Sequence, residues 1–215
     1  METYTDSMTR MKDYFESDPS LFSAYWNSNL LMMTRLEGYG AYLWIQFPID
    51  ETEVSTLDNL QADNHEDYAG RLEQALATIR DEAQSTYDAI CAGETTFDEV
   101  FAQKGAGPYF DADSVPQGIG YCIGETNGEL YPEVIAAALS LETGEMSELV
   151  AANDGYYIIK KVADIEPGDL SFEDAKATLE PTALSEKKSD VYEQCRVQWA
   201  DEAQIVTYYD FWSES

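Results

Sequence analysis

The stretch LETGEMSELVAANDGYYIIKKV, which runs from Leu141 to Val162, decides the fold of the chain. An apolar run leads into this stretch. It starts at Pro132, a favourable first helical residue, and ends at Gly144. In the next segment, SELVAANDGYYIIKKV, the residues Asn153 to Gly155 separate two runs rich in strand-forming residues. Because Asn or Asp followed by Gly strongly favours a hairpin turn, this region predicts a helix followed by a β-hairpin.

Two further strands are expected upstream of this hairpin. The segment YLWIQFPI, Tyr42 to Ile49, is aromatic and β-branched, is too short for a helix and is stopped by Pro48. The glycine-flanked segment GIGYCIG indicates a short strand around Tyr121. Because side chains alternate along a strand, the first strand has two distinct faces. One face carries Tyr42, Trp44 and Gln46, and the other carries Leu43, Ile45 and Phe47.

Helical periodicity marks the regions that surround these strands. It predicts one helix over Leu21 to Glu37, a long amphipathic helix over Asp67 to Cys91 and another helix over Leu184 to Ala203. A capping box at Thr96 to Glu99 opens a short helix that runs to about Lys104. The order of strands and helices predicts an α+β core with amphipathic helices at both ends of the chain.

The remaining segments are predicted as connections or breaks. The acidic segment Asp50 to Glu66, which contains His65, is expected to be a connection, and Gly105 to Asp113 a loop. Ser171 opens a helical region that Pro181 is expected to break. The aromatic tail QIVTYYDFW is expected to form a strand.

Composition excludes several classes of function. The chain has 215 residues with 44% apolar content, enough for a sizeable core, and its 12 basic against 42 acidic residues give a net charge of −30. Such a charge repels nucleic acid and anionic lipid surfaces. The longest apolar runs are far shorter than the roughly 20 residues that cross a bilayer. We therefore expect no nucleic-acid partner and no integral membrane span in this chain.

The cysteines and the histidine give no metal or disulfide pattern. Cys91, Cys122 and Cys195 are widely spaced, and His65 is the single histidine in the sequence. A zinc site is therefore not expected, because such sites need clustered Cys and His ligands. An odd number of cysteines also leaves one thiol unpaired in a monomer, so no disulfide framework indicates a cellular compartment.

The sequence resembles the parvulin-type peptidyl-prolyl isomerases, in particular the multidomain bacterial foldases that carry a parvulin domain between chaperone helices. Their pattern is a His-Ile-Leu strand, a long helix, a Phe-Asp-x-Leu helix, a glycine-rich strand, a Gly-Gln-Met-x-Pro-x-Phe segment, a Leu-x-x-Gly-Glu-x-Ser helix end and a Gly-Tyr-His-Ile-Ile-Lys strand. This chain has YLWIQF, TTFDEVF, GIGYCIG, GELYPEV, LETGEMSELV and DGYYIIKK in the same order. From Gly128 to Lys160 the correspondence needs no gap.

The resemblance implies a fold and three segments. The expected fold is α+β, with a small antiparallel or mixed parvulin-like sheet surrounded by helices. Residues 41–164 would form the parvulin-like domain. Residues 1–40 and 165–215 would be helical segments that pack together into a separate lobe.

The resemblance also implies site residues, with marked departures from the family pattern. The family histidines of the first and last strands are replaced by Trp44 and Tyr157. The candidate polar residues are Tyr157 and either Asp111 or Asp113, between which the sequence does not choose. The substrate-binding candidates are Trp44, Gln46, Leu130, Val134, Leu139 and Asp154. An equally weighted alternative makes Trp44 and Tyr157 core aromatics that stabilise a strand pair.

Three functions are compatible with these residues. The first is a foldase that binds unfolded or nascent exported polypeptides containing X-Pro bonds, with weak or degenerate isomerase activity. The second is a non-catalytic peptide-binding chaperone that keeps only the parvulin fold. The third is an acidic α+β module in which DADSVPQG binds Ca²⁺, although this segment lacks the glycine and closing glutamate of a calcium loop.

The foldase hypothesis carries further expectations. No cofactor and no metal are expected, because the isomerisation barrier arises from amide resonance and needs no nucleophile or metal to be lowered. By resemblance, we expect the protein outside the cytoplasmic membrane, in a bacterial cell envelope or secreted, with its export leader absent from this chain. A homodimer is an assembly that the sequence leaves open.

Overall fold

A computed structural model describes residues 4–28, 31–105, 119–126 and 130–202 of the chain. These residues belong to two compact units, Met1–Leu170 and Ser171–Ser215, which are described separately below. Asp111 and Asp113, the segment DADSVPQG and the predicted C-terminal strand lie outside the described residues.

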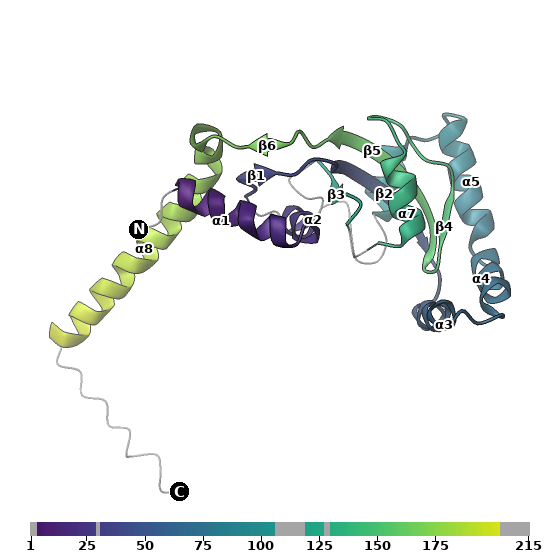
Figure 1. Cartoon of the computed structure of the whole chain (residues 1–215), viewed down its shortest axis with the longest axis horizontal. Coiled ribbons are helices and arrows are strands. Elements are labelled where there is room, and N and C mark those ends of the chain that lie inside the picture. The colour runs from purple at the N-terminus through teal and green to yellow at the C-terminus, as the bar shows by residue number, and fades with distance from the viewer. Residues whose placement is uncertain (1–3, 29–30, 106–118, 127–129, 203–215) are drawn as a thin grey trace, which may run out of the picture. The chain divides into compact units, whose positions relative to one another are not determined.

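The first unit is built on a four-stranded antiparallel sheet in the order β3-β2-β5-β4 (Figure 1). Its strands are β2 (Gly40–Pro48), β3 (Tyr121–Ile123), β4 (Val150–Ala152) and β5 (Gly155–Asp164). The long strands β2 and β5 pair along their whole length at the centre of the sheet. The sequence-predicted strands and hairpin are therefore confirmed, and so is the α+β class.

The hairpin turn between β4 and β5 requires glycine at position 155. Gly155 has φ +144°, and a Cβ atom placed there would lie 2.0 Å from the carbonyl oxygen of Phe47. Both the backbone angle and the close approach of β2 exclude an ordinary side chain. The Asn153 to Gly155 signal thus fixes the turn and the contact of the turn with the neighbouring strand.

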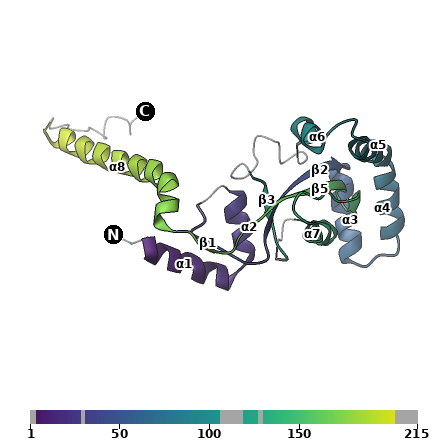
Figure 2. The same cartoon turned by 90° about the horizontal axis from the view of Figure 1, so that it is seen from above.

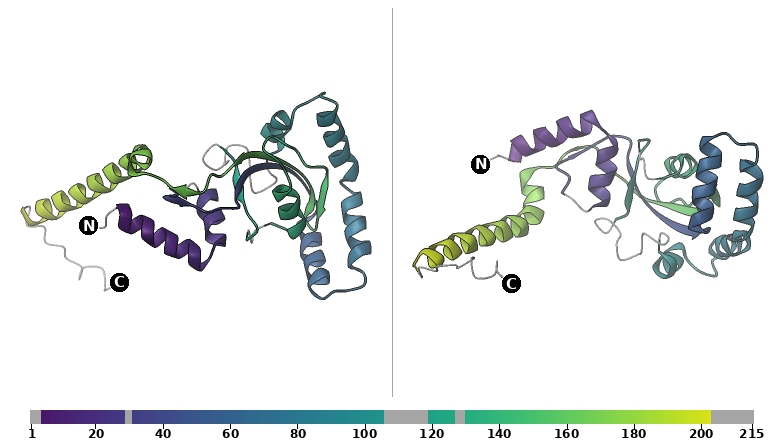
Figure 3. Two further views of the ribbon diagram at one scale, coloured as in Figure 1. Left: turned by 45° about the horizontal axis from the view of Figure 1, so that its top comes forward. Right: turned by 90° about the horizontal axis from the view of Figure 1, so that it is seen from below.

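Helices cover both faces of the sheet (Figure 3). On one face, α5 (Arg80–Cys91) and α6 (Phe97–Lys104) pack on β5 and β2. There Arg80 donates to the Tyr156 hydroxyl and Lys104 lies over the Phe47 ring. The other face is covered by α7 (Pro132–Leu139), which contacts β3, β4 and β5. Because side chains alternate along β5, Tyr157 lies on the α7 face, opposite to Tyr156.

The amino-terminal part of this unit has its own hydrophobic core. This part contains α1 (Tyr4–Ser17) and α2 (Ser20–Asn27). A small antiparallel pair of β1 (Thr34–Arg35) with β6 (Gly168–Asp169) completes it. Phe15, Phe22 and Trp26 pack here, together with Cys122 of β3. The Trp26 indole donates to the carbonyl of Gly120 at 3.0 Å, which ties α2 to the strand β3.

The prediction of a single helix over Leu21–Glu37 is wrong. The helix α2 ends at Asn27, whose side chain accepts the backbone N–H of Cys122, and the chain then enters β1. The long-range pairing of β1 with β6 outweighs the helical periodicity of this segment.

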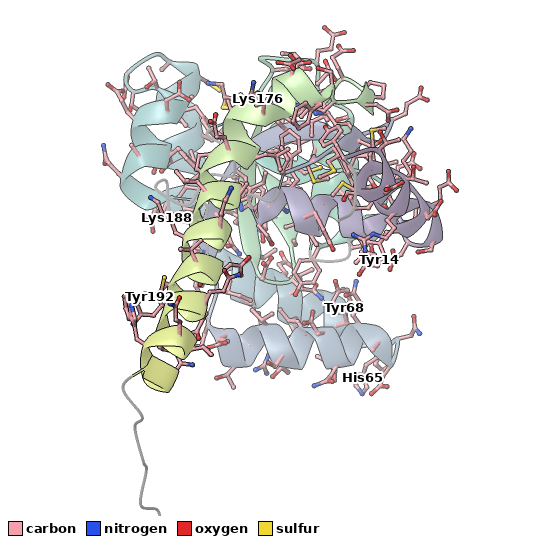
Figure 4. All side chains as sticks on the ribbon, turned by 90° about the vertical axis from the view of Figure 1, so that its left-hand side faces the viewer. Tyr14, His65, Tyr68, Lys176, Lys188 and Tyr192 are labelled. Atoms are coloured by element: carbon pink, nitrogen blue, oxygen red, sulfur yellow. The ribbon has the colours of Figure 1, made fainter. Side chains whose placement is uncertain are left out.

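Two other helical regions also differ from the prediction. The segment expected to be a connection forms α3 (Glu51–Ala62), capped by Asp50, with Leu57 fully buried. The long helix expected over 67–91 is divided into α4 (Tyr68–Ala77) and α5, and the Thr78 hydroxyl bonds the carbonyl of Ala75 at the break. His65 is exposed in the α3–α4 connection, close to Tyr68 (Figure 4).

The second unit contains one long helix, α8 (Phe172–Glu202), visible as a continuous coil in Figure 2. Ser171 accepts the backbone N–H of Asp174 and thereby caps its start, as predicted. The helix continues through Pro181, so the predicted break is wrong. Large apolar side chains are exposed along α8: Phe172, Leu184, Val191, Tyr192, Val197 and Trp199. No described helix is long and apolar enough to cross a membrane.

Candidate functional site

Three predicted site residues form one hydrogen-bonded cluster on the α7 face of the sheet. Gln46 of β2 lies directly opposite Tyr157 of β5 in the strand register. Asp154 of the hairpin turn joins them, because its Oδ2 accepts the Tyr157 hydroxyl at 2.5 Å and the Gln46 amide at 2.8 Å. The structure therefore brings these three candidates together at the turn end of the sheet, and their roles in a site stay predictions.

Burial controls the electrostatics of this cluster. Burial raises the pKa of the Asp154 carboxyl, and the hydrogen bonds from Tyr157 and Gln46 lower it in part. Burial and the neighbouring Asp154 both raise the pKa of the Tyr157 hydroxyl, so the tyrosine remains a neutral donor. The second carboxylate oxygen of Asp154, Oδ1, is buried and has no hydrogen-bond partner among the described residues.

The apolar candidates Trp44 and Val134 belong to the hydrophobic core of the sheet, and Leu130 packs against it. Trp44 is only 3% exposed, and its ring lies 4.6 Å from the ring of Tyr121. Val134 is fully buried, whereas Leu130, two residues before α7, is half-buried. The packing of Trp44 supports its role as a core aromatic, and Leu130 offers the more accessible apolar surface.

Leu139 lies in another environment. It lines an open pocket of about 600 Å³, together with Pro19, Leu36, Glu37, Gly38, Tyr39, Glu125 and Thr126. Leu139 is thus removed from the cluster of Gln46, Asp154 and Tyr157, because it ends α7 whereas Leu130 precedes that helix. Its role as a substrate-binding residue stays a prediction.

Sequence reasoning missed a second polar network beside the cluster. The buried Asn153 side chain donates to Asp58 and Gln61 of α3, at 2.9 and 2.7 Å, and accepts the Tyr68 hydroxyl at 2.7 Å. The Tyr131 hydroxyl, at the start of α7, also donates to Asp58. No local signal marks these contacts, because the partners are widely separated in sequence and α3 was predicted to be a connection.

The cluster has two hydrogen-bond donors and one buried acceptor atom, Oδ1 of Asp154, that has no partner among the described residues. Within the described residues, no group of three His, Cys, Asp or Glu side chains is placed to hold a metal ion. The cluster contains no thiol, serine or imidazole. Its described side chains supply two hydrogen-bond donors, Tyr157 and Gln46, which are both bonded to the Asp154 carboxylate.

The comparisons with known proteins identify the family. The model of the PPIC-type PPIase domain matches residues 51–177, more than half of the chain. The chain belongs to this family. The resemblance to parvulin-type isomerases is therefore confirmed. The PPIC-type match begins after β2, so Trp44 and Gln46 lie outside the matched residues.

Relatives with curated names are similar over part of their length. The foldase protein PrsA of Clostridium perfringens is 28% identical over 131 residues, which cover 60% of this chain and 38% of the relative. The foldase protein PrsA of Caldanaerobacter subterraneus is 31% identical over 114 residues, which cover 49% and 36%. The chain thus spans less than two fifths of the length of these relatives.

Similar solved structures were also found. The solution structure of TbPIN1 aligns with 60% of this chain and all of that chain, at 20% identity and a TM-score of 0.34. The crystal structure of PrsA from Bacillus subtilis aligns with 96% of this chain and 63% of that chain, at 19% identity and a TM-score of 0.30.

Proposed function

We propose that this protein is a foldase that binds proline-containing segments of unfolded exported polypeptides, with weak or absent isomerase activity. The observation that carries the proposal is the match of the PPIC-type domain to a chain whose sheet presents Gln46, Asp154 and Tyr157 as a buried polar cluster. The curated relatives named foldase support the same role, and by analogy we place the protein outside the cytoplasmic membrane.

The apolar surface supports binding of the proline ring. Leu130 is half-buried beside the buried Val134, and a pyrrolidine ring placed against Leu130 would lose water-exposed surface. Such a contact contributes about 1–2 kcal/mol by area bookkeeping. A peptide amide beside it could exchange hydrogen bonds with the Tyr157 hydroxyl or the Gln46 amide. These contacts are sufficient for a weak peptide site.

Catalysis needs more than this binding. The isomerisation barrier is about 18–20 kcal/mol, and an enzyme lowers it only through contacts that are stronger with the twisted amide than with the planar one. In this chain the Tyr157 hydroxyl is already engaged with Asp154. A non-catalytic peptide-binding chaperone is therefore the second candidate function, and the internal engagement of Tyr157 favours it.

A peptide assay distinguishes these functions. Binding of a short Ala-Pro peptide is measured by calorimetry, and its cis-trans exchange by NMR, for the wild type and for Leu130→Ser and Tyr157→Phe. Tyr156→Phe is the matched control, because Tyr156 lies on the opposite face of the sheet and bonds Arg80. The foldase proposal predicts binding that Leu130→Ser weakens and Tyr156→Phe leaves unchanged.

The rate of exchange then separates the two candidates. Catalysis that depends on Tyr157 but not on Tyr156 supports a residual isomerase, and binding without acceleration supports the non-catalytic chaperone. Absence of peptide binding by the wild type would refute both. Strong catalysis that Tyr157→Phe does not change would show that the active groups lie elsewhere.

A further inference from the structure

The helices α3 and α4 lie between β2 and α5, within the residues that match the PPIC-type domain. α3 lies at the turn end of the β4–β5 hairpin, next to the polar cluster (Figure 1). The bidentate contact of Arg71 with Glu53 fastens α4 to α3. The helix pair is thus placed to act on the site.

Asn153 is the point at which this helix pair holds the hairpin turn. Its side chain is buried, and both its amide group and its carbonyl oxygen are bonded to residues of α3 and α4. Asn153 is followed directly by Asp154, whose carboxylate accepts hydrogen bonds from the Tyr157 and Gln46 side chains. Movement of Asn153 would therefore carry the Asp154 carboxylate with it.

Asp58 connects the same turn to α7. Its Oδ1 accepts the Asn153 amide at 2.9 Å and the Tyr131 hydroxyl at 3.1 Å. Tyr131 is the residue before α7, and its carbonyl accepts the N–H groups of Val134 and Ile135. One carboxylate of α3 thus holds both the hairpin turn and the start of α7.

We propose that Asp58 and Asn153 are positioning residues of the peptide site, which itself rests on the proposed function. Together they fix the separation between the start of α7, where Leu130 provides apolar surface, and the hairpin turn that carries Asp154. Groups held in place before a ligand arrives bind it more tightly, because less order must be created on binding. The helix α3 therefore sets the affinity of the site without touching the peptide.

The test compares substitutions on one helix. Asp58→Ala removes both hydrogen bonds, whereas Asp58→Asn keeps an oxygen that can accept them and removes the charge. Asp63→Ala, at the exposed end of α3, is the matched control for charge. Asn153→Ala tests the turn directly. Should Asp58→Ala fail to fold, Tyr131→Phe removes only the bond between α7 and Asp58.

Two readouts are needed. Affinity for an Ala-Pro peptide is expected to fall roughly tenfold in Asp58→Ala and Asn153→Ala, the equivalent of losing one or two hydrogen bonds. It should recover to within about threefold in Asp58→Asn and stay unchanged in Asp63→Ala. Amide exchange at Ile49, which donates to the carbonyl of Asp154, should accelerate in Asp58→Ala, while exchange at Ile159 in the central strand should not.

The outcomes separate this inference from the proposed function. A wild type that binds no peptide refutes the function and the inference with it. A wild type that binds, with Asp58→Ala binding equally well, refutes only the positioning role. Equal losses in Asp58→Asn and Asp58→Ala would show that the negative charge matters rather than the hydrogen bonds, and would also overturn the positioning role.

Discussion

The substitution Tyr157→Phe tests the energetic importance of the polar cluster. Tyr157 is only 2% exposed, and its hydroxyl donates to Asp154 Oδ2 at 2.5 Å. Phenylalanine keeps the ring in the core and removes this donor. Asp154 would then retain the Gln46 amide as its side-chain partner. The change thus isolates one buried hydrogen bond to a carboxylate.

The expected loss of stability is about 2 kcal/mol at pH 7, since hydrogen bonds to charged groups contribute about 1.5–3 kcal/mol. For a chain of this size, this loss corresponds to a fall in melting temperature of roughly 4–8 °C. Tyr156→Phe is the control, because Tyr156 lies next to Tyr157 on β5. Its hydroxyl accepts a hydrogen bond from the exposed Arg80 side chain and contacts no carboxylate in the cluster. The control should melt close to the wild type.

The loss should also depend on pH. Burial raises the pKa of Asp154 above its ordinary value of 3.8, so this group favours folding most below that value and less as pH rises through its folded pKa. The Tyr157 hydrogen bond lowers this pKa, and Tyr157→Phe therefore raises it further. The difference between variant and wild type should be small near pH 4 and full at neutral pH. Urea unfolding at both pH values measures it, and a pH-independent difference would refute this explanation.

Three further predictions concern the turn, the carboxylate and the second unit. Gly155→Ala should destabilise the protein by more than about 3 kcal/mol, because the new Cβ would clash with the backbone of Phe47. Thermal unfolding measures this loss, and a variant as stable as the wild type would refute the turn geometry. Asp154→Asn should flatten the pH dependence of stability between about pH 4 and 7, and an unchanged profile would assign that dependence to another group. Deletion of 172–215 should cause aggregation if this segment packs with the first helices, and a cooperatively folding, monomeric truncation would exclude that lobe.

The sequence predicted the elements whose signals are local. The hairpin follows from Asn153 to Gly155, because a turn depends on a few adjacent residues. The capping box at Thr96 is present as predicted, with reciprocal bonds between Thr96 and Glu99. Such features depend on neighbours in the chain, and so they are visible without the fold.

The sequence could not reveal elements that depend on distant partners. The sequence of α3 is mostly polar and is typical of a connection. In the fold, however, Asn153 of the hairpin turn and Tyr131 before α7 donate hydrogen bonds to its residue Asp58. The sequence also could not show which face of β2 is turned toward a site. Trp44 and Ile45 lie on opposite faces and are both buried, so neither face is marked by exposed residues. In the site, Asp154 and Gln46 were named from the resemblance, but their shared bond with Tyr157 required the fold.

The internal bonding of the cluster explains why binding can outlast catalysis at such a site. A peptide amide that reaches Tyr157 must replace the bond to Asp154, so one hydrogen bond is lost for each one made. Contacts with Leu130 are the same for the planar and the twisted amide, because the pyrrolidine ring is apolar in both. Interactions that are equal in the ground and transition states increase affinity but do not lower the barrier. We therefore expect binding of proline segments to persist at the proposed site, and isomerase activity to be weak or absent.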